Sequence, residues 1–340
     1  SPVTKKYFLG LDQGTTGTTA LILDENWDIV SQVNCEHKQY YPKPGWVEHD
    51  PIEIWEKTKE AVGRALKEAN ISTNDIKAMG IDNQGETVLV WDKNTGVPVY
   101  NAIVWQDRRT SEMADRLKEE WGNVIKEKTG LVVDSYFSAL KIKWILENVE
   151  NAKARAEKGE LIAGTIDSWL IWKMTNGKLH MTDYSTASRT MLLNIHTGKW
   201  DQDILNKLEI PEKMLATIYS SSMLYGYTDP DCFLGGKIPI AGNIVDQQSA
   251  LFGQACFKPG TVKTTYGTGC FMLMNTGHKI VDSPNGLLTT VAWGLNDKMS
   301  FALDGGVYIT GAAIQWLRDG LGIIASAKET EEMAKSVENT

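Results

Sequence analysis

The sequence predicts an α/β protein built from two related domains with a cleft between them. Three strand-like segments, residues 7–12, 20–23 and 29–34, precede the first predicted helix. A strand–turn–strand pattern returns at residues 260–275 and resembles the first one. The chain has 340 residues, of which 42% are hydrophobic, so it is long enough for about two domains.

The elements that follow the first three strands agree with this class. Asp50 can cap a helix, Pro51 suits its first position, and Glu53 places an acid in the first turn of a helix that ends near Ala69. Further strands are predicted at residues 76–81 and 88–91, the latter before a turn at 94–96. Doubly wound nucleotide-binding folds alternate strand and helix from the start. A meander before the first helix is instead typical of an actin-like, ribonuclease-H-like domain.

The second domain begins with the repeated hairpin. Residues 260–266 read as a strand, 267–269 as a tight turn and 271–275 as the returning strand. The long segment between the hairpins, Ser111–Lys213, is mostly helical in pattern, and its tryptophans are expected in the core. We therefore predict an N-terminal domain over residues 1–253 and the start of a second, incomplete domain over residues 254–340.

Charge and composition exclude several function classes. The net charge of −8, without long Lys/Arg runs, argues against nucleic acid as a partner. No apolar stretch approaches the roughly 18 residues of a membrane helix, and Ser1–Lys6 does not read as a secretory signal. The four cysteines lack metal-ligand spacing, so we expect reduced thiols and a cytoplasmic protein.

Both hairpin tips are candidate phosphate sites. Phosphate requires converging backbone N–H groups and hydroxyls, which a Gly/Thr tip supplies, and Asp12 at the end of the first strand suits Mg²⁺. Either tip taken alone is better explained as an ordinary tight turn, because short Gly/Thr motifs match freely by chance.

Two polar segments at strand ends are candidate substrate sites. Asp246 follows a short apolar segment and could accept a proton from an attacking hydroxyl, although it could also be a helix cap. The cluster at residues 83–87, with Glu86, suits hydroxyl recognition or a plain solvated loop. Strong local signatures, such as a Gly-x4-Gly-Lys-Ser/Thr loop, are missing from the sequence.

Several long motifs resemble the FGGY family of carbohydrate kinases, and within it the members that phosphorylate glycerol. The resemblance covers essentially the whole chain and rests on these stretches: Leu11–Thr16, Tyr41–Asp50, Tyr100–Gln106, Thr186–Leu192, Asp246–Gln248, Thr265–Phe271 and Gly311–Arg318.

The resemblance implies transfer of the γ-phosphoryl group of ATP to glycerol, in line, giving sn-glycerol 3-phosphate. It implies a general base at Asp246 and a Mg²⁺-side carboxylate at Asp12. The implied polyol-binding residues are Glu86, Trp105, Tyr136, Asp246, Gln247 and Phe271. The implied nucleotide-binding residues are Thr15, Thr16, Gly17, Thr268, Gly311 and Gln315. A homodimer and a homotetramer both stay open.

Three departures from the family pattern keep other functions open. Gly85 stands where the polyol loop usually has arginine, and Asp82 stands where a neutral residue is common. Thr19 replaces an arginine on the phosphate side. The family's chains are also longer, so we expect the adenine pocket to be missing from these residues. The alternatives are a kinase for another polyol or sugar, and a binding or regulatory homologue with weakened catalysis.

Overall fold

The fold is taken from a computed structural model of the chain. The structure describes residues 5–26 and 28–245 and, beyond them, the backbone of β15 (Val262–Thr265), β16 (Phe271–Gly277), β17 (Leu288–Leu295) and β18 (Lys298–Asp304). Structural statements below concern these residues.

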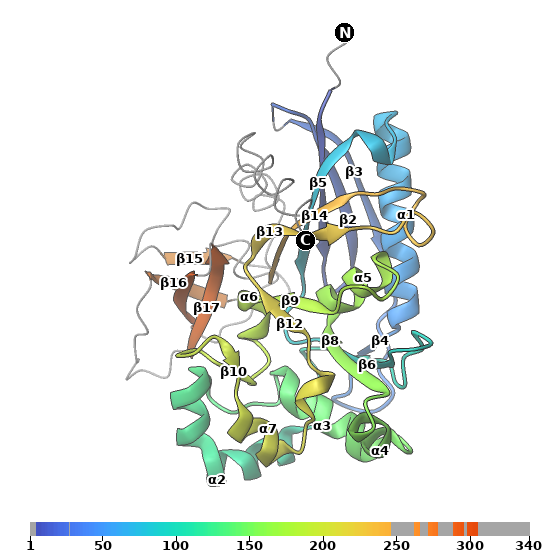
Figure 1. The fold of residues 1–340 in the computed structure, drawn as a ribbon. Coiled ribbons are helices and arrows are strands. Elements are labelled where there is room, and N and C mark those ends of the chain that lie inside the picture. Colours follow the sequence, from blue (N-terminus) through green and yellow to red (C-terminus); the bar gives the residue numbers. More distant parts are fainter. Residues whose placement is uncertain are drawn as a thin grey trace.

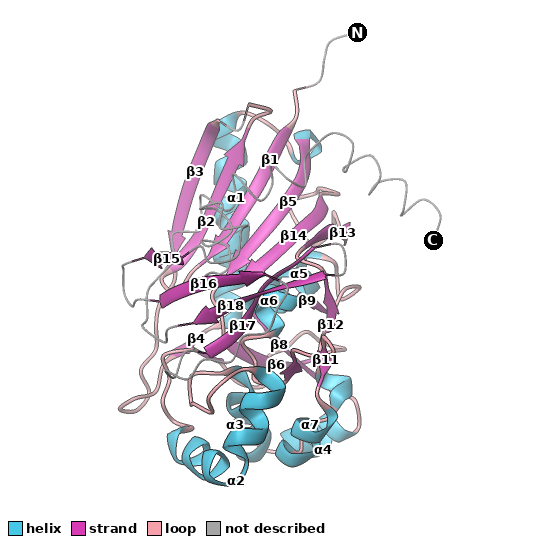
Figure 2. Cartoon of the chain, turned by 90° about the vertical axis from the view of Figure 1, so that its left-hand side faces the viewer, coloured by secondary structure: helices cyan, strands magenta, loops and turns pink. Residues whose placement is uncertain are grey.

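The predicted meander and two strands beside it belong to the ten-stranded central sheet and lie in the upper half of the molecule as drawn (Figures 1 and 2). The five strands are β1 (Tyr7–Gln13), β2 (Gly17–Leu23), β3 (Ile29–Glu36), β5 (Ile76–Asn83) and β14 (Pro239–Val245). They lie in the order β3–β2–β1–β5–β14. β1 pairs antiparallel with β2 and parallel with β5, and β14 is parallel to β5. This order and orientation confirm the predicted ribonuclease-H-like arrangement.

Helix α1 (Pro51–Ala69) covers one face of this sheet and begins where the sequence predicts (Figure 2). The Asp50 side chain accepts hydrogen bonds from the backbone N–H groups of Ile52 and Glu53, which satisfies two of the helix's first N–H groups. The helix ends at Asn70, whose φ of 54° is left-handed. Its apolar stripe packs with α5 (Ile166–Met174) against residues such as Leu11, Ile22 and Ile81. Burial of this face holds the helix on the sheet.

The segment 111–213 forms a second, helix-rich lobe below the sheet (Figure 1). Its helices are α2 (Ser111–Thr129), α3 (Ser138–Asn148), α4 (Ala152–Glu157), α6 (Tyr184–Ala187), α7 (Gln202–Leu208) and a 3₁₀ turn at Glu212–Met214, whereas α5 of the same segment packs with α1 on the central sheet. It also contains the short strands β8 (Leu161–Thr165), β9 (Met181–Asp183), β10 (Leu193–Asn194) and β11 (Lys199–Trp200). The mostly helical prediction is correct for this lobe but missed these strands, which are too short to show a clear period.

A small second sheet joins this lobe to the central sheet. Its order is β4 (Glu48–His49), β7 (Ala102–Ile103), β6 (Val88–Asp92) and β8. The predicted turn after β6 is present, with the Asp92 carboxylate accepting from the Asn94 and Thr95 backbone N–H groups. The chain returns beside β6 only through an isolated bridge between Trp91 and Pro98, so β6 takes β7 and β8 as its partners in the sheet.

The remaining strands extend the central sheet. β13 (Ser222–Tyr227) pairs antiparallel with β14, and β12 (Thr217–Tyr219) pairs with β9. β15 and β16 form an antiparallel pair in which Thr265 lies opposite Phe271, which confirms the predicted second hairpin. Its tip, residues 266–270, lies outside the described residues.

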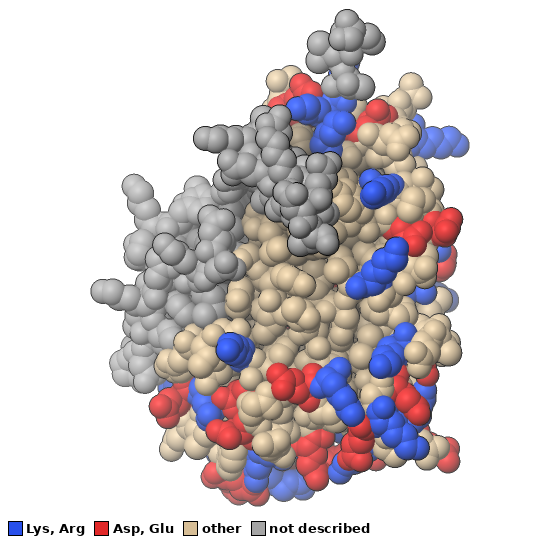
Figure 3. Space-filling view, in the orientation of Figure 1, with Lys and Arg blue, Asp and Glu red and all other residues tan. Residues whose placement is uncertain are grey.

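Charged side chains gather at the end of the molecule formed by α2, α4 and α7, with both signs interspersed (Figure 3). Several form ion pairs, such as Lys207 with Glu120 and Lys143 with Glu147. Exposed pairs of this kind contribute little stability individually. Among the described helices, none combines the length and apolar character that crossing a membrane requires.

Candidate active site

The first hairpin tip, residues 14–16, joins β1 to β2 and is tightly held. The Gly14 N–H donates to the Gly17 carbonyl at 2.9 Å, and the Thr16 carbonyl accepts from the His37 N–H at 3.1 Å. A Cβ on Gly17 would lie 2.7 Å from the Cys35 carbonyl oxygen, so this position requires glycine. Thr15 is buried and Thr16 is exposed. The tip is therefore a rigid turn that presents Thr16 to its surroundings, as a phosphate site requires.

Asp12 has a second carboxylate beside it. β1 and β5 are parallel, and their register places Asp12 opposite Asp82, so both side chains leave the same face of the sheet. Burial raises the pKa of Asp12 from its ordinary 3.8 to about 7. A nearby cation would reverse this shift.

These two carboxylates fit Mg²⁺. Hard oxygen ligands suit this ion, which commonly uses one or two carboxylates together with substrate phosphates and water. Among the described residues, no three His, Cys, Asp or Glu side chains form a metal-holding group. A cation at Asp12 and Asp82 would accordingly depend on oxygens from the nucleotide as well. Asp82 departs from the family pattern in the sequence, and its position beside Asp12 follows from the pairing of β1 with β5, which the sequence alone does not show.

The loop at residues 83–87 connects the tip to the rest of the site through side-chain amides. The Gln84 Nε2 donates to the Gln13 Oε1 at 2.9 Å, and the Thr87 hydroxyl donates to the Gln84 Oε1 at 2.9 Å. The same Gln84 amide lies 3.5 Å from the Nδ1 of His49. Burial lowers the pKa of His49 to about 3, so this imidazole is neutral and adds no charge.

Glu86 is held in an unusual backbone conformation. Its φ is 67°, and the Thr87 N–H donates to the Gly85 carbonyl across it at 2.8 Å, which makes a γ-turn. The Glu86 carbonyl accepts from the Ser138 hydroxyl at 3.0 Å. Such conformations cost about 1–3 kcal/mol and concentrate at functional sites. The strained backbone therefore agrees with the predicted functional role of Glu86.

Trp105 and Tyr136 line a hollow of about 230 Å³ together with Gln106, Asp107, Arg108, Asp134 and Ser135. Their rings meet edge to face, with centroids 5.8 Å apart. The Trp105 indole N–H donates to the Thr15 hydroxyl at 3.0 Å, and the Trp105 backbone N–H donates to the Thr87 hydroxyl at 3.1 Å. Trp105 thus connects the candidate phosphate tip, the 83–87 loop and the hollow.

Lys141, to which no sequence motif assigns a role, is a buried lysine that holds the segment carrying Tyr136. Its ammonium group donates to the carbonyls of Ser135, Tyr136 and Phe137 at 2.7, 2.6 and 3.2 Å. Burial lowers the pKa of Lys141 to about 8. A lysine inside an apolar helix pattern gives no sequence signal for this role, because its partners are backbone carbonyls.

The end of β14, directly before Asp246, is anchored by α6. The Val245 backbone N–H donates to the Ser185 hydroxyl at 3.0 Å, and that hydroxyl donates to the Asp183 carboxylate at 2.6 Å. Asp183 also accepts from the Ser221 hydroxyl at 2.6 Å. The chain is therefore fixed at the residue before the predicted base.

The structure brings together Thr15, Thr16, Gly17, Asp12, Glu86, Trp105 and Tyr136 of the predicted residues. Phe271 opens β16, and its backbone alone is described. Asp246, Gln247, Thr268, Gly311 and Gln315 lie outside the described residues, so their roles stay predictions.

A ribonuclease-H-like fold with a Gly/Thr tip beside an aromatic hollow defines the class as a phosphotransferase of the actin-like type. The comparisons then give the family. The N-terminal domain of the FGGY family of carbohydrate kinases matches residues 7–253, and the C-terminal domain matches residues 262–340. The chain belongs to the FGGY family of carbohydrate kinases.

Individual relatives agree with this family. Glycerol kinase 2 of Thermotoga maritima is 60% identical over 333 residues, which cover 98% of this chain and 67% of the relative. Glycerol kinase of Caldanaerobacter subterraneus is 60% identical over 336 residues. The crystal structure of Plasmodium falciparum glycerol kinase with ADP superposes with a TM-score of 0.83 at 38% identity, covering 95% of this chain and 65% of that one. The chain thus spans about two thirds of the length of these relatives.

Proposed function

We propose that the protein uses Mg-ATP to phosphorylate a terminal hydroxyl of glycerol, giving sn-glycerol 3-phosphate in the cytoplasm. The observation that carries this proposal is the hydrogen bond from the Trp105 indole to the Thr15 hydroxyl. It joins the candidate phosphate tip to the candidate polyol hollow, and phosphoryl transfer requires the two substrates to meet. The named functions of relatives at 60% identity point to the same acceptor.

Each predicted residue then has a task. Glu86 and Gln247 bind glycerol hydroxyls, while Trp105, Tyr136 and Phe271 pack against its carbon chain. Asp246 accepts the proton of the attacking hydroxyl. Thr15, Thr16, Gly17 and Thr268 hold the phosphates, and Gly311 and Gln315 contact the nucleoside. Asp12, with Asp82, would hold Mg²⁺, which neutralises charge on the phosphates when bound.

A second candidate is a kinase for a longer polyol or a sugar. Gly85 supports it, because glycine has no side chain to fill the pocket or to donate hydrogen bonds to a small polyol. A binding protein with weakened catalysis is the third candidate, supported by Gly85 together with Thr19.

The first test measures ADP release from the full-length protein that carries this sequence, with Mg-ATP and glycerol, erythritol, xylitol, ribitol or xylulose. We expect glycerol to give the highest kcat/KM. If a longer polyol or a sugar gives the highest kcat/KM, that compound and not glycerol is the phosphoryl acceptor. Release with none of them from a folded protein would favour the binding protein.

The second test is Asp246→Asn. Removing the base should lower kcat at least about 10²-fold to 10³-fold, while calorimetry should show nearly unchanged acceptor binding. Unaltered turnover would show that Asp246 is not the base. Asp203→Asn, which changes an exposed carboxylate on α7, is the matched control and should keep wild-type activity.

A further inference from the structure

The motif Thr186–Leu192 directs one arginine into the interior. Arg189 follows α6 and has only 1% of its side chain exposed. Its Nε donates to the Oε1 of Glu86, whose side chain is fully buried. The two residues are 103 positions apart in sequence. The proposed function gives Arg189 no task, yet its ion pair reaches a residue predicted to bind the acceptor.

The ion pair restrains a carboxylate on a strained backbone. Glu86 lies at the centre of the γ-turn described above, so its side-chain direction is set by an unusual φ of 67°. The charge-assisted bond from the guanidinium to Oε1 restrains the carboxylate and thereby limits where its second oxygen can lie. A charged side chain that is buried also needs an ionic partner to stay ionised at low cost.

The same guanidinium contacts the aromatic wall of the hollow. It lies 5.5 Å from the centre of the Tyr136 ring and 5.3 Å from that of Phe137. Both distances are within the range of cation–π attraction. Tyr136 in turn meets Trp105 edge to face. One side chain therefore couples the carboxylate of Glu86 to the position of Tyr136.

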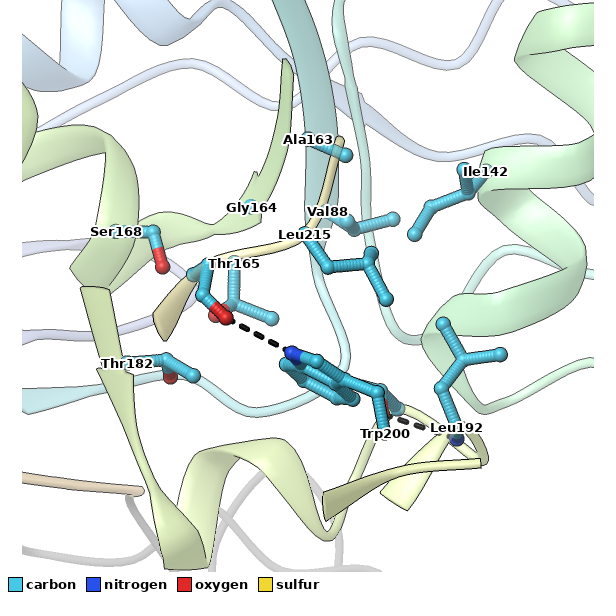
Figure 4. Close-up of a pocket in the computed structure, with 12 residues that line it drawn as sticks. Val88, Ile142, Ala163, Gly164, Thr165, Ser168, Thr182, Leu192, Trp200 and Leu215 are labelled. Carbon is cyan, nitrogen blue, oxygen red and sulfur yellow. Dashed lines mark hydrogen bonds between the residues drawn. The ribbon is translucent and has the colours of Figure 1, made fainter. Parts of the chain in front are cut away.

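Residues that follow the pair in the sequence line a small cavity. It has a volume of about 20 Å³, with Val88 and Thr190 in its lining, and is walled mostly by apolar side chains such as Ile142 and Leu215 (Figure 4). Trp200 also lines it, and its indole N–H donates to the Ala216 carbonyl at 2.8 Å. Such a volume holds at most about one water molecule.

We propose that Arg189 is a positioning residue for the phosphoryl acceptor: it orients the Glu86 carboxylate and supports Tyr136, and it thereby sets acceptor affinity. Residue 85 is glycine in this chain and brings no charge to the loop, whereas Arg189 places a cation against the Glu86 carboxylate. This proposal rests on the proposed function, because it assigns Arg189 to the same acceptor site.

The test is a double-mutant cycle of Arg189→Met and Glu86→Gln in the full-length protein, with the acceptor that the wild type uses best. Arg189→Met should raise the acceptor KM roughly 30-fold and leave the ATP KM unchanged. In the Glu86→Gln background the same change should raise the acceptor KM less than about 3-fold, because its target is already altered. Arg189→Lys keeps the charge but not the planar group, and should raise the acceptor KM about 5-fold.

A purely structural arginine would give a different result. Substituting a purely structural arginine would lower the melting temperature and change the KM values of acceptor and ATP alike. Its effect on the acceptor KM would also add to the effect of Glu86→Gln. Arg155→Met is the matched control, because it makes the same substitution at an arginine that pairs with Asp92 and Glu160 and contacts neither Glu86 nor Tyr136 in any of these ion pairs. It should leave the acceptor KM unchanged.

The outcomes separate the two proposals. An active wild type whose acceptor KM does not respond to Arg189→Met or Arg189→Lys overturns the role of Arg189 alone. If Arg189→Met does not fold, Arg189→Lys decides with the same KM measurement. A folded wild type that phosphorylates no acceptor overturns the proposed function and this role together.

Discussion

The strands of the central sheet carry apolar side chains along one part of their length and polar side chains at one end. Where α1 and α5 cover it, β1, β2 and β5 contribute apolar residues such as Leu11, Ile22 and Ile81 to a continuous core. Where β1 and β5 end, the same strands carry Asp12, Gln13, Asp82 and Asn83, a cluster of carboxylates and amides at least partly removed from solvent.

This difference separates stability from function. Apolar burial stabilises the fold, whereas a buried polar group contributes only about 1 kcal/mol when paired and is costly when its partner is lost. The polar end therefore needs a purpose other than stability, and the tip, the 83–87 loop and the anchored end of β14 meet there. Substitutions in the covered part should change unfolding, and those at the polar end should change turnover.

The largest stability effect is expected for Trp169→Ala in the covered part. Trp169 is fully buried on α5, packs against Trp91 and Trp172, and donates from its indole to the Pro51 carbonyl at 2.9 Å. Truncation should lower the free energy of unfolding by about 3–5 kcal/mol. Denaturant titration measures this loss.

Trp169→Ala also tests whether the covered part contributes to stability alone and not to function. Assayed below its melting temperature, Trp169→Ala should keep wild-type KM values for acceptor and ATP. A selective change in either KM would show that the covered part shapes the site directly. Ile52→Ala, at an exposed position on α1, is the control and should change stability by less than about 0.5 kcal/mol.

The sequence predicts the covered part well. The strand periods, the Asp50–Pro51 helix start and the two hairpins depend on neighbours in sequence, and the structure confirms each of them. The short strands β8 and β9 were missed because they pair with β6 and β12, which lie far along the chain. Three to five residues carry too little pattern to overcome the helices around them.

The polar end was predicted less completely, for a related reason. Motifs identify Glu86, Trp105 and Tyr136, but the residues that hold them in place are known only from long-range contacts. Arg189 reaches Glu86 across 103 residues, and the Thr15 hydroxyl accepts from Trp105 across 90. A serine- and threonine-rich motif gives no local sign that its arginine is buried.

The second prediction concerns Asp183, which anchors β14 behind the polar end. Burial raises the pKa of Asp183 from its ordinary 3.8 to about 6. Between these values the folded protein binds a proton that the unfolded chain does not, so stability from this group rises as pH falls and is lost as pH rises through about 6. The full shift corresponds to about 3 kcal/mol.

Asp183→Asn removes this titration. The unfolding free energy of the wild type, relative to that of the variant, should therefore increase as the pH is lowered from 7 to 4, measured by denaturant titration at each pH. Asp203→Asn, at a carboxylate with 69% of its side chain exposed, should follow the wild type. A difference between wild type and Asp183→Asn that is independent of pH would show that Asp183 does not take up a proton in this range.

The smallest effect is expected for Trp105→Phe, which tests the connection between tip and hollow at a single bond. Phenylalanine keeps an edge-to-face contact with Tyr136 but cannot donate to the Thr15 hydroxyl. One neutral hydrogen bond contributes about 1 kcal/mol, so kcat/KM should fall about 5-fold and the free energy of unfolding should fall by about 1 kcal/mol. Steady-state kinetics with acceptor and ATP varied in turn measure this change.

Because Thr15 belongs to the candidate phosphate tip, the loss should be seen for both substrates. A loss confined to the acceptor would mean that Trp105 acts only as a wall of the hollow, and that the tip is positioned by the Gln13 and Gln84 amides instead.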